Sequence, residues 1–341
     1  THNTINILEV DVMDKKLEKF LREIDKMKLH DANGTPSLKK PSLSKNLQRA
    51  HAMNFMSYSY LSPFWCGISW SSWHSFQDVL SNSQVLPAFP GVYRIKASGF
   101  DHLMYIGQTG RNLRERVSTL IKKTLEDQMP YNDPHTAAPS LWAWRDAEGW
   151  EFECSVAPIE LPKEKREGFE CYLLWQYRLE RGESTLCNHG RFHRDYIKSK
   201  SRKSQFRGRR LKDTEPRNDA WGESMAPLKF HGNPVSSKFM GLKWSDFIRE
   251  GEFSSLIPTE SGVYRVKALE SNDILYIGQS TNLRKRAKSH FQKDWGQKIS
   301  ISFCVLKDVR PYQLKEAEND LIGGFYFIEQ SVPIFQFKNL K

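Results

Sequence analysis

Two predicted hairpins stand out in the pattern of apolar and polar positions. Residues 92–96 and 103–106 are rich in apolar, aromatic and β-branched side chains, and the Ser-Gly-Phe-Asp stretch at 98–101 has the composition of a turn. Residues 263–267 and 274–277 repeat this arrangement around a second polar turn. The pattern therefore predicts two antiparallel strand pairs in separate parts of the chain.

Helical spacing of apolar residues follows each predicted hairpin. Helices are expected to begin at about Leu113 and Leu283, and longer helices are expected over 163–181 and 311–327. Near the N-terminus, Asp14 would cap another helix, whose apolar positions are Leu17, Phe20, Leu21, Ile24 and Met27. Strands in hairpins combined with separate helices predict an α+β fold.

One motif occurs twice at the predicted hairpins. Gly-Val-Tyr-Arg at 91–94 precedes Tyr-Ile-Gly at 105–107, and the same strings recur at 262–265 and 276–278 with identical spacing. A Gly-x-x-Trp-Ser string lies upstream of each copy and contains Trp70 or Trp244. Because these tryptophans occupy equivalent places, we expect them in the core. The repeat therefore extends over a whole domain.

The duplication sets the expected domain organisation. We expect an N-terminal helical extension over residues 1–60, a first domain over 61–190, a basic linker over 191–235 and a second domain over 236–341. The first domain carries an extra stretch at about 125–150, which we interpret as an insertion. A length of 341 residues suits two domains with an extension.

Charge and composition narrow the class of protein. The net charge of +11 favours a polyanionic partner, with nucleic acid the leading candidate. No apolar run reaches the length of a membrane span and no apolar signal core is present, which predicts a soluble, cytoplasmic protein without a membrane partner. The five cysteines are scattered, so we expect no disulfides.

The basic segment, residues 191–217, holds eleven Lys or Arg residues against three acidic ones. Such a run is typical of a solvated, flexible linker. Contact with phosphates is an equally weighted alternative on a chain of this charge. The candidate DNA-binding residues are Lys203, Arg207, Arg209 and Arg210.

The repeated tyrosine and glycine strings, an arginine after each hairpin and a glutamate on a later helix resemble the GIY-YIG nuclease family. Homing endonucleases, excision-repair nucleases and some restriction enzymes belong to it. The resemblance covers residues 67–190 and 241–341. It implies two tandem domains, each a small antiparallel sheet flanked by helices with a one-metal site for phosphodiester hydrolysis.

The resemblance assigns a role to five residues of the first copy. One of the two tyrosines Tyr93 and Tyr105 would help to deprotonate or orient the attacking water, although tyrosine, with a pKa of about 10, needs nearby cations or the metal to act as a base. Arg116 would clamp the scissile phosphate. Glu170 would be the single metal-binding carboxylate, which suits Mg²⁺, with Mn²⁺ as a substitute. Asn188 would support the site by hydrogen bonding.

The second copy carries the corresponding residues Tyr264, Tyr276, Arg286, His290 and Glu318, with Glu318 as its metal ligand. It departs from the family pattern at Gln336, which keeps the amide of the late asparagine but moves it by one methylene. The first copy departs at Gly110 or a neighbour, which adds one residue before Arg116, and it has Leu120 where the second has His290. We expect the first copy to be catalytic because its Glu and Asn neighbourhoods both fit.

Other assignments compete with these at two places. Other glutamates on the same helices could replace the chosen carboxylates: Glu164, Glu167, Glu316 and Glu329. A metal site at Cys187, His189 and His193 is the less favoured reading, because their spacing matches no common zinc motif.

We therefore expect a Mg²⁺-dependent endodeoxyribonuclease that cleaves double-stranded DNA, of restriction or defence type, with one or both copies active. Two sites in one chain would let a monomer cut both strands, and a homo-oligomer remains open. The alternatives are a non-catalytic nucleic-acid binder on the same scaffold and a DNA-repair nuclease.

Overall fold

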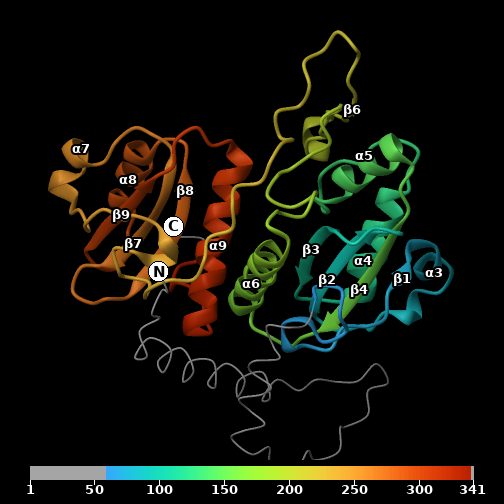
Figure 1. The fold of residues 1–341 in the computed structure, drawn as a ribbon, viewed down its shortest axis with the longest axis horizontal. Coiled ribbons are helices and arrows are strands. Elements are labelled where there is room, and N and C mark those ends of the chain that lie inside the picture. The colour runs from blue at the N-terminus through green and yellow to red at the C-terminus, as the bar shows by residue number, and fades with distance from the viewer. Residues whose placement is uncertain (1–58, 339–341) are drawn as a thin grey trace, which may run out of the picture.

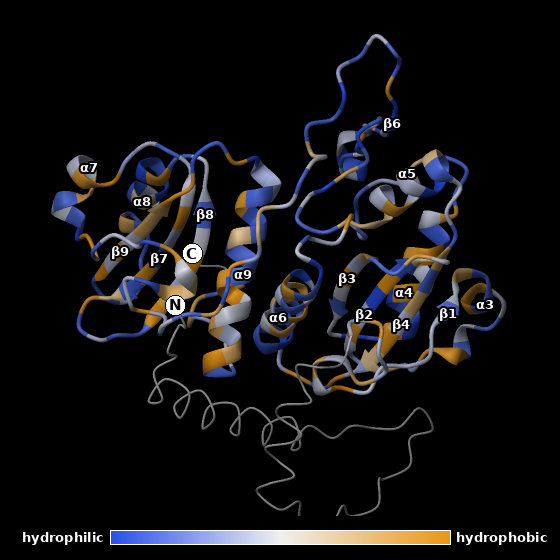
Figure 2. Cartoon of the chain, in the orientation of Figure 1, coloured by the Kyte–Doolittle hydropathy of each residue, from blue (hydrophilic) through white to orange (hydrophobic). Residues whose placement is uncertain are grey.

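The computed structural model describes residues 59–338, and the predicted N-terminal helix lies outside them. The described chain is mixed α/β, with antiparallel sheets and helices arranged in two halves side by side (Figure 1). We refer to residues 59–190 as the first half and to residues 236–338 as the second half. Figure 2 shows hydrophobic and hydrophilic residues intermixed along the strands of the two main sheets, whereas the long loop near β6 is mostly hydrophilic.

The first half is built around a four-stranded sheet with the order β1-β4-β2-β3. Its elements are β1 (His74–Ser75), α3 (Phe76–Ser81), β2 (Gly91–Ala97), β3 (Leu103–Thr109), α4 (Leu113–Thr124), α5 (Ala138–Glu148), β4 (Phe152–Pro158) and α6 (Lys163–Arg181). All of its strand pairs are antiparallel, and β2 and β3 form the predicted hairpin. The expected insertion contributes α5, which contacts α4.

The second half has a three-stranded sheet with the order β8-β7-β9. Its elements are α7 (Phe253–Leu256), β7 (Gly262–Ala268), β8 (Ile274–Ser280), α8 (Leu283–Phe291), β9 (Ile299–Val305) and α9 (Pro311–Glu329). The register matches that of the first half, since Tyr264 pairs with Gly278 and Tyr93 pairs with Gly107. Both hairpins shift register after the fifth residue of their first strand.

A buried arginine marks the face of each sheet opposite the tyrosines. Arg94 and Arg265, the last residues of the Gly-Val-Tyr-Arg strings, are 0% and 1% exposed. Their guanidinium carbons lie 4.3 Å from the ring centroids of Trp70 and Trp244, respectively. The tryptophans are thus buried, as expected, and they compensate for part of the burial of a charge by cation–π contact.

The two halves share one hydrophobic core through the contact of α6 with α9. Glycines bring these helices together: a Cβ atom at Gly323 of α9 would lie 2.8 Å from the carbonyl oxygen of Cys171 in α6. A Cβ atom at Gly168 would lie 2.7 Å from the ring of Tyr326. The close approach therefore depends on small residues on both helices.

The basic segment differs from the solvated linker that its charge predicts. Its strand β5 (Tyr196–Ile197) pairs with β6 (Arg209–Arg210), and Phe192 and Tyr196 are 1% and 0% exposed. Both aromatic residues pack in a small core with Trp142 of α5. The aromatic side chains between the basic residues therefore anchor the segment to the first half. A prediction based only on the number of charged residues misses this packing.

Two further expectations can be compared with the structure. All five cysteines are free. No helix within residues 59–338 is both long enough and apolar enough to cross a bilayer.

Candidate functional site

Two tyrosines face each other on the hairpin of each half. Tyr93 of β2 and Tyr105 of β3 have ring centroids 6.0 Å apart. In the second half, the rings of Tyr264 and Tyr276 are 6.1 Å apart. Since the register of the two hairpins is the same, the repeated motif builds the same tyrosine pair twice.

The glycine of each Tyr-Ile-Gly string makes room for the tyrosine pair. A Cβ atom at Gly107 would lie 2.6 Å from the rings of both Tyr93 and Tyr105. At Gly278 it would lie 2.6 Å from the ring of Tyr264 and 2.7 Å from that of Tyr276. Sequence reasoning did not assign this role, although the glycine's presence in both copies was a signal for it.

Replacing Gly278 with alanine is expected to lower the free energy of unfolding by about 1–3 kcal/mol, because the added methyl group forces both rings to move. Urea denaturation followed by circular dichroism measures the change. Gly251→Ala is the matched control, since a Cβ atom there meets nothing within 4 Å. Equal stability of the two variants would contradict the packing role of Gly278.

An arginine one turn into the following helix belongs to each site. Asn112 and Asn282 cap α4 and α8 by accepting a hydrogen bond from the backbone N–H three residues later. Both helices therefore begin at the same point of the motif, and the extra residue of the first copy lies in the β3–α4 loop. Arg116 lies near Tyr93, where its charge opposes the rise in the pKa of Tyr93 that burial causes.

A half-buried glutamate completes each group. Burial raises the pKa of Glu170 to about 8, the Glu167 carboxylate adds to the rise, and Arg116 opposes it. Burial raises the pKa of Glu318 to about 7, against the opposing charges of Arg286 and Lys315. Each carboxylate thus lies where additional positive charge would stabilise its ionised form, which fits a divalent cation with oxygen ligands.

Two of the competing glutamates, Glu316 and Glu167, have different surroundings. Glu316 is fully buried and pairs with Arg178 and Arg191, so its charge is already compensated. Glu167 remains a competitor in the first half, since its Oε2 atom is buried without a hydrogen-bond partner among the described residues. Within residues 59–338, no group of three or more His, Cys, Asp or Glu side chains could hold a metal, and this includes the loop with Cys187 and His189.

An amide side chain fixes the middle residue of each Tyr-Ile-Gly strand. Asn188 accepts a hydrogen bond from Ile106 N at 3.0 Å and donates one to Ile106 O at 2.9 Å. Gln336 accepts one from Ile277 N, also at 3.0 Å. The longer glutamine side chain therefore reaches the equivalent backbone atom. The asparagine therefore no longer separates the two copies, which removes one of the two grounds on which the first copy was ranked above the second.

His290 distinguishes the second site from the first. Its Nε2 atom lies 2.9 Å from the hydroxyl of Tyr264, while Leu120 occupies the equivalent helix position in the first half. Burial lowers the pKa of His290 to about 3, with smaller contributions from Lys293 and Arg286. His290 is therefore neutral near pH 7, so one of its ring nitrogens can accept a hydrogen bond from the Tyr264 hydroxyl.

The insertion contacts the first site directly. Arg116 donates a hydrogen bond from Nη1 to Pro134 O at 3.1 Å, and the Thr136 side chain hydrogen-bonds Tyr105. Arg286, at the equivalent position of the second half, is exposed. The arginine of the first site is thus fixed by a hydrogen bond to the insertion, whereas the arginine of the second site is exposed.

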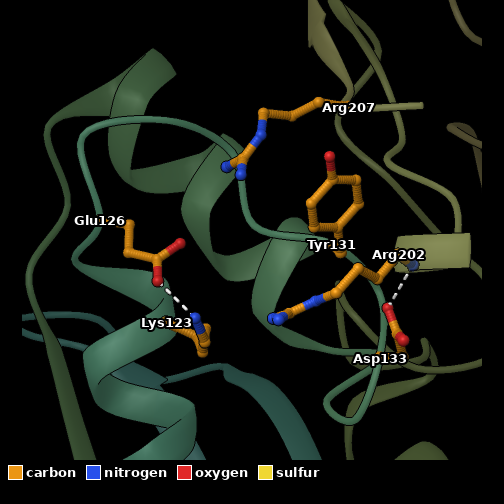
Figure 3. A pocket seen from close by; sticks show the side chains of 6 residues that line it. All are labelled: Lys123, Glu126, Tyr131, Asp133, Arg202 and Arg207. Carbon is orange, nitrogen blue, oxygen red and sulfur yellow. Dashed lines mark hydrogen bonds and ion pairs between the residues drawn. The ribbon is translucent and has the colours of Figure 1, made fainter. Parts of the chain in front are cut away.

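The predicted DNA-binding residues have different surroundings. Arg207 lies 4.6 Å from the Tyr131 ring centroid and belongs to a cavity of about 210 Å³. Figure 3 shows Arg202 and Arg207 reaching across this cavity towards Lys123 and Glu126. The sequence did not single out Lys123 or Arg202 as a DNA-binding candidate.

The other three candidates lie elsewhere on the basic segment. Arg209 forms two hydrogen bonds with Glu215, at 2.6 and 2.7 Å, which offset its charge. Arg210 lies over the ring of Tyr196, and Lys203 is exposed. Of the four predicted DNA-binding residues, only Arg207 therefore lines the cavity of about 210 Å³.

Comparisons with known proteins point to the second half. Residues 260–317 match the family model of the GIY-YIG catalytic domain, a span that includes Tyr264, Tyr276, Arg286 and His290 and ends one residue before Glu318. UvrABC system protein C of Chlamydia caviae is 42% identical over 52 residues, which is 15% of this chain and 8% of that protein. The chain thus covers only a small part of that relative's length. No solved structure matches the chain.

Proposed function

We propose, from the GIY-YIG catalytic domain in the second half, that the chain is a Mg²⁺-dependent endonuclease that hydrolyses phosphodiester bonds in double-stranded DNA. The observation that carries the proposal is one cluster of side chains, in which the rings of Tyr264 and Tyr276 lie 6.1 Å apart and His290 Nε2 lies 2.9 Å from the Tyr264 hydroxyl. Arg286 lies on α8, and its charge opposes the rise in pKa of three groups from other elements. These are Tyr264 on β7, Tyr276 on β8 and Glu318 on α9. Such a group can bind a phosphate, a metal and an attacking water together.

The chain's own residues supply most of the proposed chemistry. With Nε2 of the neutral His290 as the acceptor, the Tyr264 hydroxyl donates to it, and the lone pairs of the tyrosine oxygen then face the attacking water and orient it by hydrogen bonding. Arg286 offsets the negative charge that develops on the phosphate. Glu318 would hold the Mg²⁺ or Mn²⁺ ion, which would act as a Lewis acid on the phosphate when bound.

We propose that the first half is a second GIY-YIG domain and that both halves cut. Tyr93, Tyr105, Arg116, Glu170 and Asn188 form the corresponding cluster there. Because Arg116 is held by the insertion while Arg286 is exposed, the second site should be the faster one. This reverses the ranking expected from the sequence.

The charge distribution supports duplex DNA as the substrate. Lys123 follows Arg116 by two turns on α4 and lines the same cavity as Arg202 and Arg207, where these three cations outnumber the carboxylates of Glu126, which pairs with Lys123, and Asp133. The phosphates of a DNA duplex would contact these lysine and arginine side chains whatever the base sequence. A restriction or defence role fits cleavage without a partner protein and is part of the proposal.

Incubation of supercoiled plasmid with the protein tests the proposal. We expect nicked and linear DNA with Mg²⁺ and no cleavage with a chelator. A panel of methylated and unmethylated DNA covers the unknown recognition requirement. Tight binding of all these DNAs without any cleavage would support the non-catalytic binder instead.

A DNA-repair nuclease is the second candidate, favoured by the similarity to UvrABC system protein C. It would cut duplexes that carry a lesion and leave matched intact duplexes uncut. Cleavage of an undamaged plasmid at equal rate would count against it.

Metal binding is expected to weaken as the pH falls, more steeply at the first site than at the second. Only the ionised carboxylate binds a metal, and the pKa values are about 8 for Glu170 and about 7 for Glu318. From pH 8 to pH 6, affinity for Mn²⁺ should fall ~50-fold at the first site and ~10-fold at the second. Calorimetry on Glu318→Gln and Glu170→Gln isolates the two sites, and identical profiles would contradict the expectation.

A further inference from the structure

A cavity of about 460 Å³ in the first half is lined largely by aromatic rings, and none of the proposed catalytic residues lines it. The rings come from separate parts of the chain: His102, Trp144, Trp150, Tyr177 and Trp221. His102, Trp150 and Trp221 are half-buried, so part of each ring is accessible to solvent. The cavity therefore offers flat apolar surfaces to a ligand from outside.

Two buried ring nitrogens at the cavity lack hydrogen-bond partners. Trp144 is only 5% exposed, and its indole N–H has no acceptor among the described residues. The Nε2 atom of His102 is likewise buried without a partner. Because buried polar atoms are nearly always paired in folded proteins, the N–H of Trp144 favours a ligand that carries a hydrogen-bond acceptor.

Carboxylates lie at the opening of the cavity. The side chains of Glu148 and Glu183 are 45% and 49% exposed, and both line it. Glu183 lies 3.3 Å from Arg181 and Glu148 lies 3.4 Å from His193, and the remaining lone pairs of both carboxylates favour a ligand with N–H donors. Arg194, whose side chain is 62% exposed, also lines the cavity and could contact a phosphate outside it.

We propose that this cavity receives a single nucleobase turned out of the DNA duplex, and that the base carries an exocyclic amino group, as adenine and cytosine do. The proposal rests on the proposed DNA-cleaving function. The base stacks on the exposed indole faces, a ring nitrogen or carbonyl accepts the Trp144 N–H, and the amino group donates to a carboxylate. No other single ligand group combines these three features on a DNA-binding chain.

An alkylated ammonium group, which aromatic cages also bind, fits less well. It offers no acceptor for the N–H of Trp144. Trp144 and Trp150 also stack in parallel, with centroids 4.9 Å apart and planes at 6°, so they cannot enclose a cation between their faces.

The position of the cavity suits a base near the first site. Thr136, which hydrogen-bonds Tyr105, lies just before α5, and Glu148 at the other end of this helix lines the cavity. The 11 residues of α5 span ~16 Å, which corresponds to about five base steps of a duplex. One duplex could therefore reach both places.

Binding of duplexes with one unpaired base tests the proposal, because such a base is turned out at little cost. Fluorescence anisotropy without divalent metal compares the full chain on a bulged adenine, a bulged cytosine, a bulged thymine and a fully paired duplex. We expect at least tenfold tighter binding of the adenine and cytosine bulges. Trp221→Ala should lose this preference and keep its affinity for paired DNA, and Trp221→Phe should retain the preference.

Phe206→Ala is the matched control, since Phe206 is an exposed aromatic residue of the basic segment outside the cavity. Equal binding of all four duplexes would overturn the inference and leave the nuclease proposal intact. Failure to bind any duplex would remove both proposals. Saturable binding of a trimethyl-lysine peptide, lost in Trp221→Ala and without any bulge preference, would overturn the base cavity in favour of a peptide site.

Discussion

Replacing Glu318 with glutamine is expected to slow cleavage by the second half by at least about 100-fold while DNA binding persists. The substitution keeps the size and polarity of the side chain but removes the only charge that α9 places beside Arg286, Tyr264 and Tyr276. Without that charge the metal loses its protein ligand, and the phosphate loses Lewis-acid assistance. Plasmid cleavage followed over time measures the loss.

The equivalent change in the first half, Glu170→Gln, shows whether both halves cut. If they do, each single variant should accumulate nicked circles and the double variant should leave the plasmid supercoiled. If only the second half cuts, Glu170→Gln should behave as wild type. Glu329→Gln, at the exposed end of α9, is the matched control. Undiminished cleavage by the double variant would refute both metal-ligand assignments.

Local sequence patterns were enough to predict the hairpins and the helices that follow them. The turn residues and apolar runs are short-range signals, and α6 has the bounds expected from the sequence. The third strands, β4 and β9, were not predicted. They pair along the whole length of β2 and β7, a contact with residues far away in the chain that no local pattern records.

The residues of the candidate site that belong to the repeated motif could be predicted from the sequence, but the contacts between them could not. Local spacing could place the tyrosines on a hairpin, but it could not show that Glu316 is neutralised by Arg178 and Arg191, which lie in the first half and the basic segment. Nor could it show that Gln336 reaches the backbone of Ile277. Both facts depend on how separate segments pack, and both changed the interpretation of the second site.

A buried ionic network joins the two halves where α6 meets α9. Arg178 is 0% exposed and lies 2.8 Å from Asp320 Oδ1 and 3.4 Å from Glu316 Oε2. It also donates a hydrogen bond to Met225 O at 2.8 Å. Burial raises the pKa of Asp320 to about 6 even with Arg178 beside it. Asp320 therefore depends on this arginine for compensation of its charge, whereas Glu316 shares its charge between Arg178 and Arg191.

Arg178→Met is accordingly expected to lower the free energy of unfolding at pH 8 by about 3–5 kcal/mol, because it leaves the buried Asp320 carboxylate without its arginine, while Glu316 keeps Arg191. Urea denaturation followed by tryptophan fluorescence measures the change. Arg181→Met is the control, since Arg181 is exposed and pairs with Glu183 at the surface, where substitutions stay within about 0.5 kcal/mol.

The pH dependence of this deficit distinguishes lost charge pairing from lost packing. A carboxyl group whose pKa is raised in the folded state binds more protons there than in the unfolded state, so its contribution to stability falls as the pH rises from about 4 through the folded pKa. In wild type this fall ends near pH 6 for Asp320. Loss of Arg178 raises that pKa further, so the fall continues to higher pH, and the deficit of Arg178→Met should be smaller at pH 5 than at pH 8. A deficit of equal size at both pH values would show that Arg178 acts through packing and that the network does not hold the halves together by charge.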